Sequence, residues 1–126
     1  MAWYRPDKWC RVGTWSGSFC NLQYPFNPEI PNGGWDYHSN KKIVENDTSD
    51  RSDLRVWLVS CENDFGTDVA ADCMFNWTAA NSRMAEALKA KKITCHLTHC
   101  LDAVHVDVKA FSQTFPSALE WLWETK

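Results

Sequence analysis

The hydrophobic pattern divides the chain into short apolar runs that are separated by polar segments. The clearest run extends from Leu54 to Cys61, where nearly every side chain is apolar, β-branched or aromatic. A run without apolar and polar alternation is typical of a strand that is covered on both faces, as in a parallel sheet flanked by helices. Shorter runs predict two further strands, at Arg11–Trp15 and Ile93–His99.

Two segments show the three- and four-residue periodicity of amphipathic helices. The first is Phe75–Lys92, in which Asn81 falls on the polar side together with the charged residues. A second helix closes the chain, and Thr114 and Pro116 mark its predicted start because proline is favoured in a first helical turn. The apolar stripe of the first helix, which we interpret as core, consists of Trp77, Ala80, Met84, Ala87 and Leu88.

The order of these elements is strand, long loop, strand, helix, strand, loop, helix. Strands that alternate with helices favour a parallel sheet with right-handed crossovers, so the predicted fold class is α/β, with about three parallel strands and flanking helices. Residues 1–126 form one predicted domain. The long loop, residues 21–53, is rich in Pro, Asn, Gly, Asp and Ser, and it could hold a helical turn near Trp35–Asn40.

Composition narrows the function classes. The 126 residues carry a formal net charge of -3, which gives no basic footprint for nucleic acid. No apolar run approaches the length of a transmembrane segment, and the first residues lack the apolar run of a signal peptide. We therefore expect neither membrane insertion nor secretion, and a reducing compartment is favoured.

Six cysteines permit a disulfide framework, but the predicted compartment argues against it. Cys61 and Cys95 fall in predicted strands, where a free thiol packs as a small hydrophobic group. The segment Cys95–Cys100, which also contains His96 and His99, has the composition of a metal site. In a strand, however, its ligand side chains alternate between the two faces and diverge, so we predict no metal and no cofactor.

Candidate chemistry lies where the second and third predicted strands end. Asp64 follows the central strand in a polar turn, and His105 lies in the predicted loop Asp102–Lys109. The loops after parallel strands lie at the same edge of the sheet, so the two side chains are expected to meet. An acid beside a histidine is the acid and base part of a hydrolase triad, in which the carboxylate orients the imidazole. The alternatives are a simple turn at Asp64 and a solvated loop histidine.

Several segments resemble a known family. Residues 54–64, 75–91, 105–107 and 113–123 are similar to the carboxyl-terminal part of bacterial putative esterases of the esterase D and enterochelin esterase type, which are α/β-hydrolases. The strand Val12–Ser16 with the following Gly17-Ser18-Phe19 extends the similarity over essentially the whole chain. The resemblance implies a partial α/β-hydrolase fold. It also implies that Asp64 matches the triad acid and His105 the triad histidine.

The chain departs from this family at two points. It has no Gly-x-Ser-x-Gly elbow for a nucleophile, and Ser16 matches the strand after that elbow. Val104 stands where the family usually has a glycine before the histidine. An acid and a base without a nucleophile or oxyanion donors do not make an acyl-transfer site.

Three functions remain open. The chain could be a degenerate esterase-derived domain that serves as a structural or interaction subunit, inactive on its own. It could instead be the carboxyl-terminal portion of an active serine esterase whose nucleophile half is on another chain or missing from this one. A small-molecule binder is the third alternative, with Tyr37 and His38 joining Asp64 and His105 around a pocket.

The amino-terminal edge of the predicted sheet is the expected contact surface. Arg11–Trp15 would be an edge strand without a neighbour, and unprotected edges pair readily with other chains. We expect the apolar faces around Trp9, Trp15 and Trp57 to be incompletely covered by other apolar groups. A protein partner or a homo-oligomer is therefore predicted, with contacts through the edge and through residues 3–15.

Overall fold

A computed structural model describes residues 2–19, 47–71 and 75–124. These residues contain three strands and two helices, in the order strand, strand, helix, strand, helix. The expected turn near Trp35–Asn40 lies outside the described residues. The described elements are β1 Arg11–Trp15, β2 Arg55–Asn63, α2 Trp77–Ala90, β3 Thr94–Val104 and α3 Val108–Trp123.

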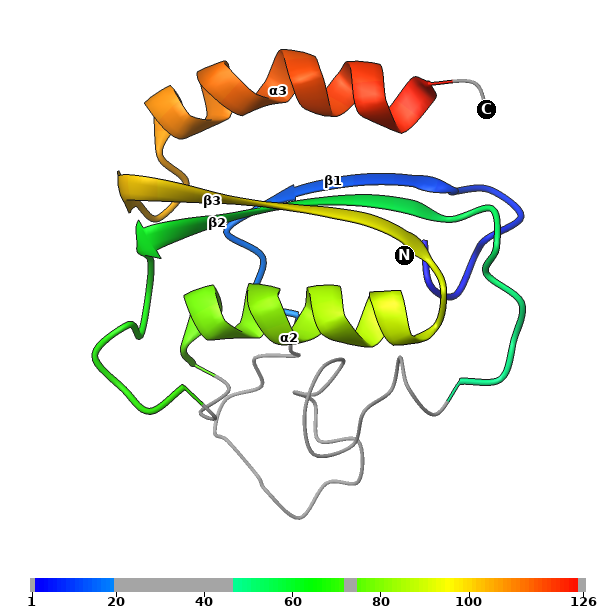
Figure 1. Ribbon diagram of the computed structural model, residues 1–126, viewed down its shortest axis with the longest axis horizontal. Coiled ribbons are helices and arrows are strands. Elements are labelled where there is room, and N and C mark those ends of the chain that lie inside the picture. The colour runs from blue at the N-terminus through cyan, green and yellow to red at the C-terminus, as the bar shows by residue number, and fades with distance from the viewer. Residues whose placement is uncertain (1, 20–46, 72–74, 125–126) are drawn as a thin grey trace.

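The three strands form one parallel sheet in the order β1-β2-β3. Helix α2 lies on one face of the sheet and α3 on the other, so the domain has three layers (Figure 1). This arrangement confirms the predicted α/β class and the central position of the apolar run. It follows from the sequence because β2 is buried on both faces, and each face therefore needs its own helix.

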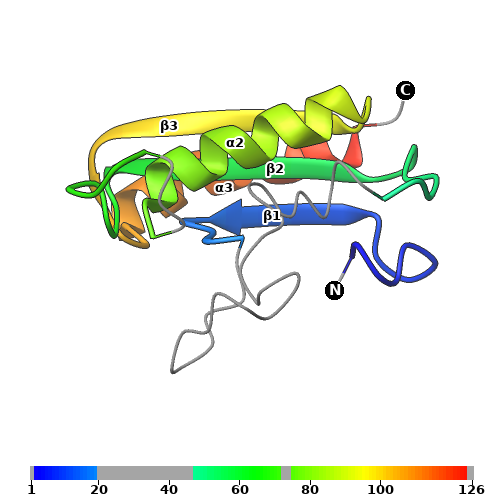
Figure 2. The ribbon, with the colours of Figure 1, turned by 90° about the horizontal axis from the view of Figure 1, so that it is seen from below.

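Alternate residues of β2 enter two different cores. Val56 and Leu58 pack under α2 with Met84 and Leu88. Trp57 and Val59 face α3, where they pack against Ala118 and Leu122. Figure 2 shows α2 lying across β2 and β3, with β1 to one side of the helix. The α2 side of β1 is therefore less covered than the rest of the sheet.

The last helix begins earlier than the sequence suggested. It starts at Val108, not near Thr114 and Pro116, and Pro116 lies inside it. Asp107 provides the true start, because its side chain accepts hydrogen bonds from the backbone N–H groups of Lys109 and Ala110. The proline signal was misleading because packing of the helix on the sheet outweighs the cost of one proline.

Three further expectations need correction. β3 extends to Val104, so the predicted loop from Asp102 is in part strand. Asn81 is fully buried rather than on the solvent side, because its Nδ2 donates to the carbonyls of Gly17 and Trp77 at 2.8 Å. Trp57 is also buried, with its ring stacked on His96.

Candidate acid and histidine site

Asp64 and His105 meet at the carboxyl ends of β2 and β3, as the strand order predicts. His105 Nδ1 lies 2.7 Å from Asp64 Oδ1. The carboxylate is wholly buried, whereas 28% of the imidazole surface is exposed. An ionised carboxylate can only accept, so Nδ1 carries the proton and donates it to Asp64. The lone pair is then on Nε2, which makes Nε2 the basic atom of the ring.

The carboxylate is held by the backbone as well as by the histidine. The N–H of Phe65 donates to Asp64 Oδ1 at 2.8 Å. The other oxygen, Oδ2, is buried and has no hydrogen-bond partner within the described part of the chain. A buried, half-satisfied carboxylate is costly, and functional sites are where such costs are usually found.

Aromatic rings enclose the imidazole. Phe65 stacks on His105 with ring centroids 4.1 Å apart, and Trp77 meets it edge-on at 5.0 Å. Phe65 and Trp77 also contact each other at 5.3 Å. These rings fix the plane of the imidazole, so its orientation is determined by packing as well as by Asp64.

The loop that carries Asp64 and Phe65 depends on a glycine. Gly66 has a φ of 70°, and a Cβ there would come within 1.9 Å of the Phe75 carbonyl oxygen. The turn therefore accepts only glycine without rearrangement. The same loop ends at Asn76, which caps α2, because its Oδ1 accepts a hydrogen bond from the N–H of Ala79.

A bulge in β3 carries His105 toward Asp64. The register shifts between Cys61 and Asn63, where the ladder of β2 with β3 becomes irregular. Asp102, on β3, has a φ of 54°, and its N–H donates to Glu62 Oε2 at 2.8 Å instead of joining the ladder. Bulges often re-aim side chains near functional sites. Sequence reasoning missed the bulge in β3, although acidic residues near the strand ends, Glu62 and Asp102, are compatible with it.

Sequence reasoning assigned Ser16 to a strand but did not indicate its contacts. It is buried, has a φ of 55°, and its Oγ accepts a 3.1 Å hydrogen bond from the N–H of Val106. The same hydroxyl donates to Cys61 Sγ at 3.7 Å. Ser16 therefore ties the end of β1 to the residue that follows His105.

The remaining candidates do not join this site. Tyr37 and His38 lie outside the described residues. In the segment Cys95–Cys100, His96 faces Trp57 and α3, whereas Cys95 and Leu97 face the core under α2, as the alternation predicts. Among the described residues no three His, Cys, Asp or Glu side chains gather as metal ligands would.

The cysteines in described positions are free thiols. These are Cys10, Cys61, Cys95 and Cys100. Burial raises the pKa of Cys95 to about 11, and burial likewise raises the pKa of Cys100. A nucleophilic cysteine has a lowered pKa, because the thiolate is the reactive form. Cys95 and Cys100, whose pKa values are raised, therefore lack this property.

Comparisons of this chain with protein-family models, with curated proteins and with solved structures find no match. The resemblance to bacterial esterases therefore stays a prediction that rests on the sequence segments themselves. Within the described ranges, no helix is both long enough and apolar enough to cross a membrane.

Proposed function

We propose that this chain is an esterase-derived α/β unit that has kept the acid and histidine of a triad without acyl-transfer chemistry. Its role is that of a structural or interaction subunit in a larger assembly. The observation that carries the proposal is the Asp64–His105 pair, which has the separation of a catalytic pair but, among the described residues, no nucleophile hydrogen-bonded to the histidine.

The hydrogen bonds of the nearby hydroxyl groups support this reading. Ser16 is engaged by Val106 and Cys61, and Ser60 hydrogen-bonds to His99 Nδ1 at 2.9 Å. Among the residues that the structure describes, no hydroxyl group hydrogen-bonds to His105. A histidine that has no nucleophile to deprotonate cannot generate an acyl-enzyme.

The surface supports an interaction role. β1 is an edge strand of the described sheet, and Trp9, two residues before it, is 52% exposed. Large exposed aromatic side chains near an open edge are typical of protein contact surfaces.

Reaction with a fluorophosphonate probe tests the proposal. We expect the purified chain to keep its intact mass after incubation with the probe and to release no p-nitrophenol from p-nitrophenyl acetate. A serine adduct that disappears in the His105→Ala variant would overturn the proposal, because it would show an activated nucleophile. Denatured protein serves as the control for non-specific labelling.

A second candidate is an esterase completed by another polypeptide, and the intact Asp64–His105 geometry favours it. In that case the partner supplies the nucleophile and the oxyanion donors. A protein that co-purifies with the chain, is labelled by the probe and loses labelling when His105→Ala replaces the wild type would establish this alternative.

A further inference from the structure

The outer side of β1 carries backbone groups that no other strand of the described sheet pairs with. The N–H of Ser16 donates to the Val59 carbonyl, toward β2. Because backbone groups alternate in direction along a strand, those of Arg11, Gly13 and Trp15 point away from β2. β1 pairs only with β2 in the described sheet, so these groups form an open edge.

Helix α3 carries a second apolar stripe beside this edge. The stripe is separate from the buried face formed by Ala110, Ala118 and Leu122. Its members recur at steps of three and four residues, and Val108, Phe111, Leu119 and Trp123 are 77%, 39%, 41% and 62% exposed. The stripe consists of Val108, Phe111, Phe115, Leu119 and Trp123.

Contacts with β1 show on which flank of α3 the stripe lies. The ring of Trp15 is 4.9 Å from that of Phe111 and 5.7 Å from that of Phe115. On the other flank, Trp121 contacts His96 of β3. The stripe therefore borders the open edge and not the β3 side of the molecule.

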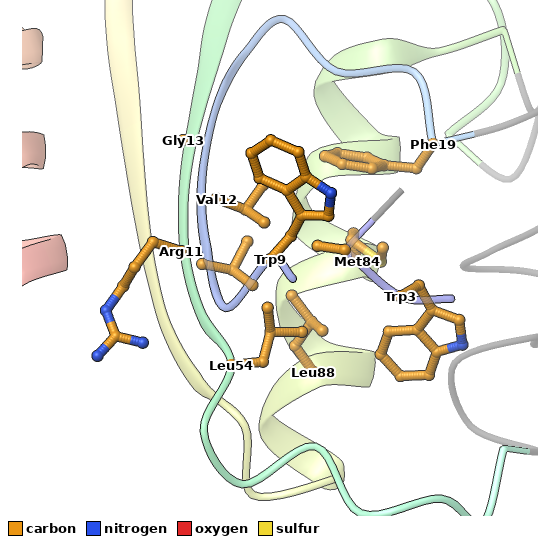
Figure 3. Close-up of a pocket in the computed structure, with 11 residues that line it drawn as sticks. Trp3, Trp9, Arg11, Val12, Gly13, Phe19, Leu54, Met84 and Leu88 are labelled. Carbon is orange, nitrogen blue, oxygen red and sulfur yellow. The ribbon is translucent and has the colours of Figure 1, made fainter. Parts of the chain in front are cut away.

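An apolar groove borders the edge on the opposite face of the sheet. It has a volume of about 510 Å³ and lies between α2 and β1, with Trp3, Trp9 and Phe19 in its wall. Figure 3 shows Trp9 and Phe19 beside Val12 and Met84. Since α2 lies across β2 and β3, no helix in the described part of the chain covers β1 on this face.

We propose that two copies of this chain pair through antiparallel β1 strands, about a two-fold axis that passes close to Gly13 and runs perpendicular to the sheet. The inference rests on the proposed function as an interaction subunit and names a second copy as the partner. Around this axis Gly13 faces its own copy, and Arg11 faces Trp15 of the second copy. These are the residues whose backbone groups point outward, so opposite residues exchange both hydrogen bonds.

The position of α3 explains why a second copy fits. The helix packs on Trp15 of β1 and on Trp57 and Val59 of β2, so it lies over both strands. With strands about 4.8 Å apart, the axis separates the two α3 helices by roughly 10 Å, which is the usual distance between packed helices. An apolar stripe on the facing flank of each helix is what such a contact requires.

The contact has a definite register. A Cβ on Gly13 would lie 3.6 Å from Leu122 Cδ1 and 3.0 Å from the ring of Trp15, which is itself 5.7 Å from the ring of Phe115. The axis is therefore level with the middle of the span from Phe115 to Leu122. Leu119 then lies next to its own copy. Because the two helices are antiparallel, Phe115 lies next to Trp123 of the second copy. On the other face, the two grooves adjoin, and Trp9 of each copy packs over the paired strands.

The β3 edge is a poorer site for pairing. Its exposed residues include His96, His99 and Asp102, and the bulge at Asp102 breaks the regular backbone. Polar side chains and bulges are the features that protect a sheet edge from pairing.

Sedimentation velocity on the whole chain tests the proposal. We expect a dimer at micromolar concentration, with Leu119→Arg raising the dissociation constant tenfold or more because it places two charges together at the axis. Gln113→Arg, which adds the same charge on an exposed α3 position off the stripe, should leave the constant unchanged. Circular dichroism checks that both variants are folded.

Crosslinking tests the register independently. Leu119→Cys should form a reducible dimer on mild oxidation, whereas Gln113→Cys and the wild type should not. A wild type that is monomeric at about 100 µM, or a dimer that Leu119→Arg leaves intact, would overturn the inference. A monomer that also resists the fluorophosphonate probe leaves the proposed function standing. A labelled serine removes that function whatever the association state.

Discussion

Asp64 and His105 could be predicted from the sequence because strand order alone brings them together. Each follows a strand of a parallel sheet, and adjacent parallel strands end at the same edge. The supporting residues could not be predicted in the same way. Ser16 and Glu62 act through hydrogen bonds to backbone groups of distant residues, and no local pattern indicates such a partner.

At the residue scale, the backbone of Val106 is strained. It has a φ of 50°, a conformation that β-branched residues avoid, and it directly follows His105. The expected obstacle was Val104, which does not have a positive φ. The strain associated with presenting His105 is therefore two residues further along the chain.

Replacing Val106 should release this strain. We expect Val106→Asn to raise the free energy of unfolding by about 1 kcal/mol, because asparagine tolerates the left-handed region. Val104→Asn is the matched control, since both valines are 53% exposed but only Val106 has a positive φ. Urea denaturation measures both. Equal effects of the two substitutions would contradict the assignment of strain to Val106.

At the scale of elements, α2 and α3 differ in how well the sequence predicts their bounds. The apolar periodicity of α2 predicted the helix to within two residues at each end. The start of α3 was missed because only His105 and Val106 separate Asp107 from β3, and Pro116 gave a competing start signal. A capping aspartate is informative only when the end of the preceding strand is known, and the bulge at Asp102 concealed that end.

The cap of α3 gives a pH dependence. The backbone N–H of Ala110, together with other backbone donors, holds the pKa of the Asp107 carboxyl below its ordinary value. Because the folded-state pKa is the lower one, the cap stabilises the fold above the unfolded-state pKa of about 3.9. This stabilisation is lost as the pH falls through the folded-state pKa.

Thermal melting of two variants measures this effect. Asp107→Asn should melt close to the wild type at neutral pH, because asparagine also caps helices, whereas Asp107→Ala should melt lower. From pH ~5 to ~2 the wild type should lose more stability than Asp107→Asn. Parallel acid profiles for the wild type and Asp107→Asn would contradict the predicted contribution of the carboxylate.

At the scale of the whole molecule, the layered arrangement followed from the apolar pattern of one strand. β2 is buried on both faces, which requires a helix on each side and places β2 between its neighbours. The sequence could not indicate how evenly the helices cover the sheet. Trp57 is covered by α3, whereas Trp9 at the β1 side is 52% exposed, and this difference depends on where each helix lies across the strands.

The same arrangement explains how the geometry of the Asp64–His105 pair is held by the fold. Asp64 and Phe65 are anchored by the Gly66 turn, and His105 is held by packing against Phe65 and Trp77. These contacts belong to the fold itself. The geometry of the pair therefore does not depend on a nucleophile being present.

The most direct test of this account is the proton NMR signal of the His105 imidazole, recorded with and without a fluorophosphonate. We predict a low-field Nδ1–H resonance that is coupled to His105, is lost in Asp64→Asn, and is unchanged by the reagent. This result would show a pair that is formed and idle. Absence of the resonance in the wild type, or a shift on addition of the reagent that accompanies a serine adduct, would contradict the account.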